Sequence, residues 1–429
     1  TNGLPGQGNR QTKQVERENV RNTTSVGTET PELISENLKL ETRTFYTVMR
    51  DHLFDPESEF SSGTPNSKTD IQQYGFHLIP TFYLLDYNQI FRLFLSNERE
   101  TFKRDRRDKF DEILDKSTRK FRNHSTIQLQ DEIRFFEKRL IFTPSVASEN
   151  YTDRYNDNER PSSYLLTPDN GRSIMRFTNS KLGLISIFLQ RGDLTIAVKG
   201  NFSTEKRAPD FLELFGERGS ILGNTTLKPE KSENGDLGPA LDFKSKNLEL
   251  KSTISFYSKK IKDMILFVPN SQFSLRPENI DSAYIRGFEF TIKSDFYKKI
   301  KFESNYTYQK AINTANVSYL NGKYLPLRPL HEWFGQMSVY NKYFETGFEA
   351  HFIGAVFKDR TNEYANYQPS RWIYNIFISY YFGGKKKDKN GKEIMATFEV
   401  KNIADTRAED FVGYPLPGRL FYATLSAKF

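Results

Sequence analysis

The chain has 429 residues, 62 of them basic and 54 acidic, with no cysteine and a formal net charge of +8. Its mean hydropathy is −0.66, and no stretch approaches eighteen consecutive apolar residues, which excludes a transmembrane helix. The basic residues are interspersed with nearly as many acidic ones, so they favour solvated strands and loops over a phosphate-tracking stripe. We therefore expect no nucleic-acid partner.

The first 39 residues differ from the rest of the chain. They are rich in Asn, Thr, Glu and Arg, and only a weak strand pattern is found around residues 9–25. We predict a poorly structured N-terminal stub or an interrupted strand over residues 1–39. Residues 40–429 form the second predicted segment.

From about residue 40 onward, segments with alternating apolar and polar residues recur. This period of two gives a strand one apolar and one polar face. In the final segment, for example, Phe421, Leu425 and Phe429 share the apolar face, and its length suffices for a tilted strand to cross a bilayer. About sixteen strands are predicted, near residues 40–50, 69–84, 88–103, 126–136, 140–153, 180–190, 193–207, 230–243, 247–267, 281–294, 299–312, 331–343, 345–357, 371–382, 395–404 and 418–429.

The connections between these strands alternate in length. Long ones cover residues 100–125, 154–179, 208–229, 313–330, 357–370 and 405–417, whereas 190–193, 295–299 and 341–344 are short. Strands of soluble sandwiches are usually about half as long as these, and outer-membrane barrels combine short periplasmic turns with long extracellular loops. We predict an all-β, antiparallel transmembrane β-barrel. The charged connection 383–393 would be an unusually long periplasmic turn.

Within the connection 100–125, a charged segment from Lys103 to Arg122 carries apolar residues at roughly helical spacing. This spacing predicts a short surface helix on an extracellular loop.

Two aspects of composition support a wide membrane barrel. Aromatic residues make up 14% of the chain, with 37 Phe and 23 Tyr, as expected of aromatic girdles at membrane interfaces. The predicted polar faces carry charges that must be hydrated or paired, because an unpaired buried charge is prohibitively costly. These charges are Glu249, Lys251, Glu289, Lys293, Lys301, Glu303, Glu399 and Lys401.

Five sequence motifs follow one another from residue 207 onward. They are Arg207-Ala208-Pro209 with Leu212-Glu213-Leu214-Phe215-Gly216 and Leu227-Lys228-Pro229-Glu230, then Ile285-Arg286-Gly287-Phe288-Glu289, then Leu325 to His331 (LPLRPLH), then Val400 to Asp405 (VKNIAD), and finally Gly413 to Arg419 (GYPLPGR). In this order they resemble the C-terminal two thirds of the barrel of TonB-dependent outer-membrane receptors. The motif residues are Arg207, Pro209, Glu213, Pro229, Glu230, Gly287, Glu289, Pro329, Asn402, Gly413, Pro417 and Phe429. We interpret them as mainly architectural; Gly287, for example, permits a close approach of backbones.

The resemblance implies a 22-stranded barrel around an N-terminal plug that carries a TonB box. The sixteen predicted strands would be the last sixteen, so we expect the plug and the first strands to be missing from this sequence, as in an excerpt or a truncated gene product. The implied location is the outer membrane. The implied partners are outer-membrane lipid, the barrel-assembly machinery through the C-terminal strand, and the TonB complex through a plug domain not in this chain.

Receptors of this family take up scarce nutrients, most often ferric siderophores, and otherwise haem, cobalamin or glycans. Haem receptors typically carry a histidine after the first motif, but none lies between Arg207 and Leu227, so a ferric siderophore or similar metal chelate is the preferred expectation. Aromatic and arginine side chains on extracellular loops suit an anionic chelate, although the same residues could merely pack the loops. The binding candidates are Tyr319, Arg328, Tyr364, Tyr367, Arg407, Phe411 and Tyr414.

Two other classes stay open at this point. A passive porin or an adhesin barrel would need no plug. A barrel enzyme would need a nucleophile or activated water beside a histidine, yet the sequence around His331 contains no nucleophile motif, and the chain has no HExxH, Walker or metal-ligand pattern. We therefore expect no catalytic residue, no cofactor and no metal site.

Overall fold

The computed structural model describes residues 14–30, 36–57, 59, 66–108, 110–116, 119–155, 171–216, 222–269, 275–384, 393–411 and 414–428. Over these ranges eighteen strands belong to one sheet, and two further strand pairs form small sheets of their own. No helix within them is long and apolar enough to span a membrane. The chain divides into two compact units, residues 1–183, 202–233 and 261–281 in the first and residues 184–201, 234–260 and 282–429 in the second.

Strands of the first unit pair with their neighbours in sequence. β1 (Glu16–Thr30), β2 (Leu38–Phe54), β3 (Asn66–Leu84), β4 (Gln89–Arg107), β6 (Lys120–Phe135) and β7 (Leu140–Arg154) form consecutive antiparallel pairs. The short β5 (Ile113–Lys116) pairs with the end of β4. Three-residue runs of left-handed backbone, Leu85–Tyr87 and Phe136–Lys138, make the tight turns at one end.

Five strands contribute residues to both units. They are β8 (Arg172–Arg191), β9 (Leu194–Arg207), β10 (Glu230–Lys244), β11 (Leu248–Pro269) and β12 (Leu275–Phe296). The short helix α1 (Phe211–Phe215) lies in the connection between β9 and β10.

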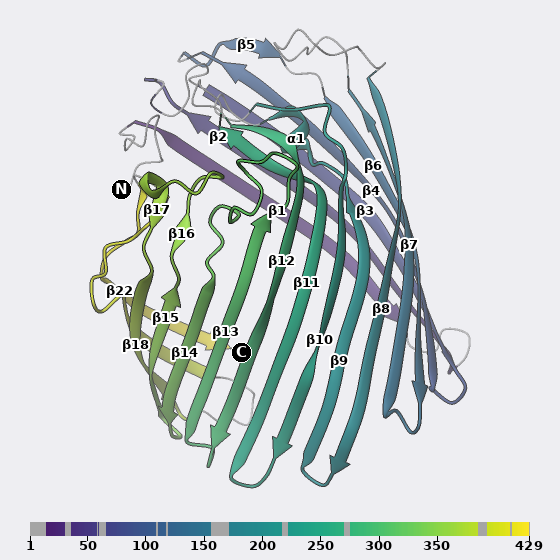
Figure 1. Cartoon of the computed structure of the whole chain (residues 1–429), viewed down its shortest axis with the longest axis vertical. Coiled ribbons are helices and arrows are strands. Elements are labelled where there is room, and N and C mark those ends of the chain that lie inside the picture. The colour runs from purple at the N-terminus through teal and green to yellow at the C-terminus, as the bar shows by residue number, and fades with distance from the viewer. Residues whose placement is uncertain are drawn as a thin grey trace. The chain divides into compact units, whose positions relative to one another are not determined.

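In the second unit, β12 is followed by β13 (Ile300–Asn313), β14 (His331–Tyr340), β15 (Phe344–Ile353), β18 (Arg371–Phe382), β19 (Glu393–Lys401) and β22 (Leu420–Lys428), each antiparallel to the one before. Figure 1 shows β13, β14 and β15 side by side in green. The loops between them carry β16 (Val356–Phe357) with β17 (Tyr367–Gln368), the 3-10 turn η2 (Tyr364–Asn366), and β20 (Glu409–Phe411) with β21 (Tyr414–Pro415).

The strand register of the second unit sorts side chains onto two faces. One row of directly paired residues is apolar across five strands: Phe302, Met337, Phe348, Ile376 and Val400. The adjacent row lies on the opposite face and is polar: Glu303, Gln336, Glu349 and Asn375. The alternation predicted from the sequence is therefore confirmed, with an apolar face suited to lipid and a polar face suited to an aqueous interior.

Charges on the polar face are paired with one another. Lys293 lies 2.5 Å from Glu303, Lys401 lies 3.4 Å from Glu399, and Lys301 lies 3.8 Å from Glu345. Lys244–Glu249 and Lys251–Asp242 are further pairs. This pairing is what the sequence required of these residues.

Aromatic side chains mark two levels on the apolar face. At one level, the ring centroid of Trp372 lies 5.6 Å from Trp333 and 4.9 Å from Phe352. At the other, Tyr380 lies 5.0 Å from Phe344. On β18, Tyr380 follows Trp372 by eight residues, which is about 26 Å along a strand and about 20 Å along the membrane normal at a tilt of about 40°. That height is close to the apolar band of about 25 Å in outer-membrane barrels.

The sequence predicted sixteen of the seventeen long strands in the described ranges, and two segments differ from expectation. The surface helix over Lys103 to Arg122 is wrong: β4 continues to Arg107, and β6 begins at Lys120, where Phe121 pairs with Thr101. Ladder hydrogen bonds to neighbouring strands decide the conformation here, whatever the local apolar spacing. Residues 16–30, where at most an interrupted strand was expected, form β1, which pairs with β2 along its whole length.

Candidate functional site

A cluster of motif residues organises the connection after β9. Asp210 caps α1 by accepting a hydrogen bond from the Glu213 N–H, and the Glu213 carboxylate accepts one from the Asp210 N–H, both at 2.8 Å. Arg207 donates to both oxygens of Glu213, at 2.9 and 3.0 Å, and to Glu230 at 2.6 Å. The other Glu230 oxygen accepts from the Ile265 N–H at 2.6 Å. Arg207, Glu213 and Glu230 thus tie the end of β9 to α1, β10 and β11.

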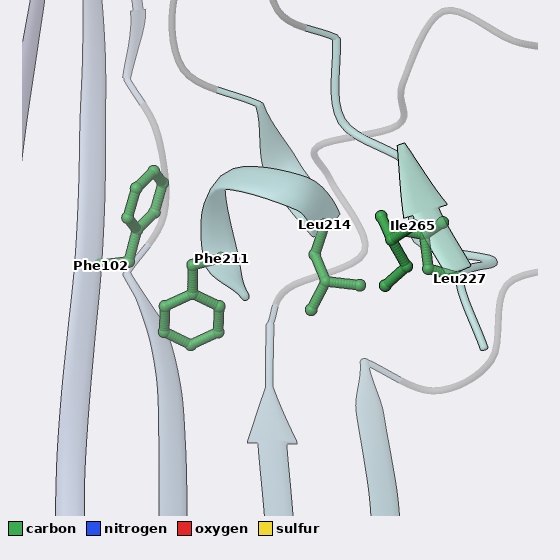
Figure 2. Close-up of a cluster of buried hydrophobic side chains, with 5 residues drawn as sticks. All are labelled: Phe102, Phe211, Leu214, Leu227 and Ile265. Atoms are coloured by element: carbon green, nitrogen blue, oxygen red, sulfur yellow. The ribbon is translucent and has the colours of Figure 1, made fainter. Parts of the chain in front are cut away.

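The helix α1 also covers a small hydrophobic core. Figure 2 shows its five side chains, contributed by β4, α1, the segment before β10, and β11: Phe102, Phe211, Leu214, Leu227 and Ile265. Cations of the neighbouring strands hold the helix as well: Arg104 donates to the Phe215 carbonyl at 3.3 Å, and the Lys120 Nζ lies 4.8 Å from the Phe215 ring. Pro209 is fully buried beside this core. These contacts support the architectural interpretation of the first motif.

Sequence reasoning missed a buried ion pair next to this core. Arg122 donates to both oxygens of Asp153 at 2.7 Å, and the two side chains are 8% and 1% exposed. The Arg122 guanidinium also lies 4.9 Å from the Phe211 ring. Glu100 pairs with Arg122 in the register, and Arg122 pairs with Asp153, so an acid–base–acid row crosses β4, β6 and β7. Each charge is visible in the sequence, but the row depends on a register that the sequence does not give.

The other motif residues are placed as follows. A Cβ at Gly287 would lie 1.9 Å from the Tyr308 carbonyl oxygen, so only glycine fits there, and Glu289 is exposed on the polar face. Asn402 is buried and exchanges hydrogen bonds with the backbone of Thr406 at 2.9 and 3.0 Å. Pro229 and Pro329 lie just before β10 and β14, and the carbonyl of Pro417 accepts from Asn402 at 3.5 Å. Gly413 and Phe429 lie outside the described residues.

Two long loops of the second unit are braced against each other. The first, residues 314–330, joins β13 to β14, and the second, residues 354–370, joins β15 to β18. The Tyr324 N–H donates to the Asn362 side chain at 2.7 Å, and that side chain donates back to the Tyr324 carbonyl at 3.0 Å. The Leu327 N–H donates to the Phe357 carbonyl at 2.9 Å. These bonds hold the two loops as one layer.

Asp359 shapes the second loop. Its carboxylate accepts hydrogen bonds from the Thr361 N–H at 2.9 Å, from the Thr361 hydroxyl and from the Glu363 N–H at 3.2 Å. Burial raises the pKa of Asp359, but these hydrogen bonds outweigh it and lower that pKa below its usual value. The turn they form places Asn362 in the left-handed region, at φ 57°, which asparagine tolerates.

The structure brings four of the seven predicted binding residues into this loop layer. Tyr319 (65% exposed) and Arg328 (exposed) lie on the first loop. Tyr364 (89% exposed) and Tyr367 lie on the second, with ring centroids 6.0 Å apart. Tyr367 also packs edge-on against Phe357 at 5.5 Å. The two tyrosines therefore form an exposed aromatic pair on a braced support.

The other three candidates lie on the loop between β19 and β22. Arg407 is exposed, and in the described part of this unit no hydrogen bond joins it to the tyrosine pair. Phe411 and Tyr414 pair through their backbones in β20 and β21; their side chains lie outside what the structure describes.

One cation of the loop layer was missed. Arg360 follows Asp359 directly, and its Nε is buried without a hydrogen-bond partner among the described residues. The charged run Lys358-Asp359-Arg360 within a long loop could have drawn attention to it. Within the described ranges, no group of three or more His, Asp and Glu side chains could hold a metal ion.

Comparisons with known proteins agree with this arrangement. The family model described as "TonB dependent receptor-like, beta-barrel" matches residues 2–403. Comparison with curated proteins gives no match. Similar solved structures include the copper transporter OprC, with 15% identity and a TM-score of 0.75 over 94% of this chain and 65% of that one. The siderophore receptor PiuA from Acinetobacter baumannii has 13% identity and a TM-score of 0.72 over 96% of this chain and 64% of that one. The ferric citrate transporter FecA is also similar, with 14% identity and a TM-score of 0.68 over 96% of this chain and 61% of that one. The chain thus spans about 65% of the length of such proteins, and at these identities the likeness shows the fold alone.

Proposed function

We propose that this chain, which belongs to the TonB-dependent receptor-like β-barrel family, is the barrel portion of a receptor for a scarce nutrient. The family consists of outer-membrane transport proteins, so the chain is an outer-membrane protein and not an enzyme. Family membership also disfavours the passive porin and the adhesin. Energised uptake would need a plug domain that engages the TonB complex. We propose a ferric siderophore or similar anionic metal chelate as the substrate class.

The braced loop layer of the second unit carries this proposal. It presents the exposed aromatic pair Tyr364 and Tyr367 together with Arg328 and Arg360. The carboxylate of Asp359, next to Arg360 in the sequence, is occupied by three hydrogen bonds of its own turn, and the Glu363 carboxylate accepts a hydrogen bond from the Thr361 hydroxyl. Guanidinium groups bind carboxylates and other planar anions, and aromatic faces stack on flat ligands. A layer with this chemistry favours an anionic, partly aromatic ligand.

The compared structures support this class by their descriptions. PiuA is described as a siderophore receptor, and FecA as a ferric citrate transporter. OprC, described as a copper transporter, has the highest TM-score of the three. The comparisons therefore support a metal chelate better than they support iron as its metal.

The test uses the intact receptor with Tyr364, Tyr367 and Arg407 all replaced by alanine. We expect the affinity for the substrate chelate to fall at least about tenfold, because each exposed aromatic or cationic contact contributes about 0.5–1 kcal/mol. The yield of folded barrel should not change. The matched control Y364F/Y367F/R407K keeps the rings and the charge and should retain most of the affinity. Unchanged affinity in the alanine variant would remove these residues from the site.

The substrate class is tested by growth under iron limitation with defined ferric chelates. A strain with the full gene should grow better on at least one chelate than its deletion strain, and the R360A variant should show an intermediate effect. The absence of any chelate-dependent difference would overturn the substrate class while leaving the family assignment intact.

A further inference from the structure

Three short turns lie next to one another at one end of the second unit. They are residues 245–247 between β10 and β11, 297–299 between β12 and β13, and 341–343 between β14 and β15. The Tyr297 N–H donates to the Asn247 carbonyl at 2.6 Å, and the Tyr340 N–H donates to the Lys299 carbonyl at 2.7 Å. Short turns face the periplasm in outer-membrane barrels, so these turns lie at the level of the periplasmic lipid headgroups.

The turns carry four lysines whose charge no described acidic side chain neutralises. Lys246, Lys298, Lys299 and Lys342, which we call the turn lysines, are all exposed. None of them forms an ion pair within the described residues, and none of the three turns contains an acidic residue. Lysines a few residues further into the strands behave differently: Lys244 pairs with Glu249, and Lys251 pairs with Asp242.

Exposed aromatic side chains accompany the turn lysines. Tyr297 is 66% exposed and Tyr343 is 41% exposed. The Lys342 Nζ lies 4.8 Å from the centre of the Tyr343 ring, and a Cβ on Gly384 would come within 2.9 Å of the Lys342 side chain, so that side chain is packed along the turn. Tyrosines beside lysines are typical of the boundary between hydrocarbon and headgroups.

The apolar face next to the 341–343 turn is hollowed. A groove of about 470 Å³ crosses β14, β15, β18 and β19, with walls formed by Met337, Phe348, Ile376 and Phe398 and with Thr346 and Val339 at its lower end. Val339 is three residues from Lys342, which is about 10 Å along the strand. An acyl chain lying in the groove would therefore place its phosphate near Lys342, with Lys298 and Lys299 on the neighbouring turn.

We propose that the groove and the turn lysines together bind one anionic glycerophospholipid of the periplasmic leaflet, such as phosphatidylglycerol. The lysines supply only donors and positive charge, so they select a phosphodiester without the ammonium group of phosphatidylethanolamine. The apolar groove, whose lining ends three residues before Lys342, favours a lipid over a soluble acidic protein, which has no acyl chain. The proposal rests on the outer-membrane location and is independent of the receptor's substrate.

The test measures lipid bound to the intact receptor by native mass spectrometry, after reconstitution with dioleoyl-phosphatidylglycerol or dioleoyl-phosphatidylethanolamine. Wild type should retain phosphatidylglycerol preferentially. K298Q/K299Q/K342Q should bind it at least about tenfold more weakly, since each lysine near a phosphate contributes about fivefold at low salt. The control K244Q/K251Q/K293Q removes the same charge from paired lysines and should keep the preference.

T346L narrows the groove without changing any charge and should weaken retention of both lipids. A heat-modifiable gel shift confirms that each variant is folded. Equal phosphatidylglycerol retention by wild type and the turn-lysine variant would overturn the proposal, as would equal losses in the two triple variants. Unchanged retention by T346L would refute the role of the groove. Tighter binding of soluble polyglutamate than of phosphatidylglycerol would identify a protein-docking surface and overturn the lipid assignment.

Discussion

Replacing Arg207 with methionine tests the contacts that hold α1 on the first unit. The guanidinium makes two hydrogen bonds to Glu213 and one to Glu230, and these carboxylate side chains are 7% and 19% exposed. R207M keeps much of the side-chain volume but removes all three bonds. It leaves two poorly solvated negative charges next to each other.

The expected cost follows from these exposures. Removing one partner of a buried ion pair costs about 3–5 kcal/mol, whereas an exposed pair contributes about 0–1 kcal/mol. Arg207 is 46% exposed, so solvent screens part of the interaction, and an intermediate value of about 2 kcal/mol is expected. This corresponds to an increase of about 30-fold in the opening of the segment that contains α1.

Hydrogen exchange of residues 208–216 in the intact receptor measures this opening directly. The double variant R207M/E213Q removes one of the two charges that R207M leaves uncompensated and relieves their repulsion, so its exchange should be slower than that of R207M alone. Protection that is unchanged in R207M would refute the argument that the ion cluster holds α1. Faster exchange in the double variant than in the single one would refute the argument about the stranded carboxylate.

Two further predictions concern the second unit. The hydrogen bonds of Asp359 lower its pKa below the unfolded value, so their contribution is present above about pH 4 and is lost as the pH falls through the lower folded pKa. In the variant Y364W, the tryptophan fluorescence should change below about pH 4, and the additional substitution D359N should abolish that change. A change that persists with D359N would show that another group than Asp359 titrates there. G287A would place a Cβ 1.9 Å from the Tyr308 carbonyl oxygen and should lower the free energy of unfolding in urea by about 3 kcal/mol. The control G322A, which meets no atom within 4 Å, should cost only about 1–2 kcal/mol for its left-handed backbone, and equal or smaller damage by G287A would refute the steric argument.

The long strands could be predicted because the type of each residue, apolar or polar, indicates which face of the strand it lies on. Phe302 and Met337 face one side, and Glu303 and Gln336 face the other, so the alternation is local information that needs no knowledge of partners. The turn motifs were predictable for a similar reason. Asn402, for example, makes its hydrogen bonds to Thr406, only four residues away.

Contacts that depend on the register between strands could not be predicted. Glu100, Arg122 and Asp153 lie side by side only because β4, β6 and β7 are aligned in this register. The failed helix over residues 103–122 has the same origin, because its apolar spacing competed with ladder bonds to strands whose positions were unknown. β1 was not clearly predicted because almost all its residues are exposed and it lacks an apolar face. Its side chains instead form hydrogen bonds across to β2, such as the one between the hydroxyls of Thr23 and Thr47, which are 3.1 Å apart.

The candidate site combines both kinds of information. Tyr364 and Tyr367 could be proposed because aromatics in a long loop are informative by themselves, but the brace from Asn362 to Tyr324 joins residues 38 positions apart and is visible only in three dimensions. Its consequence is energetic. Loops already joined to each other lose less conformational freedom when a ligand binds, so more of each contact appears as affinity. Tyr367 packs against Phe357, so we expect this preorganisation to add to its contribution if the proposed ligand contacts it.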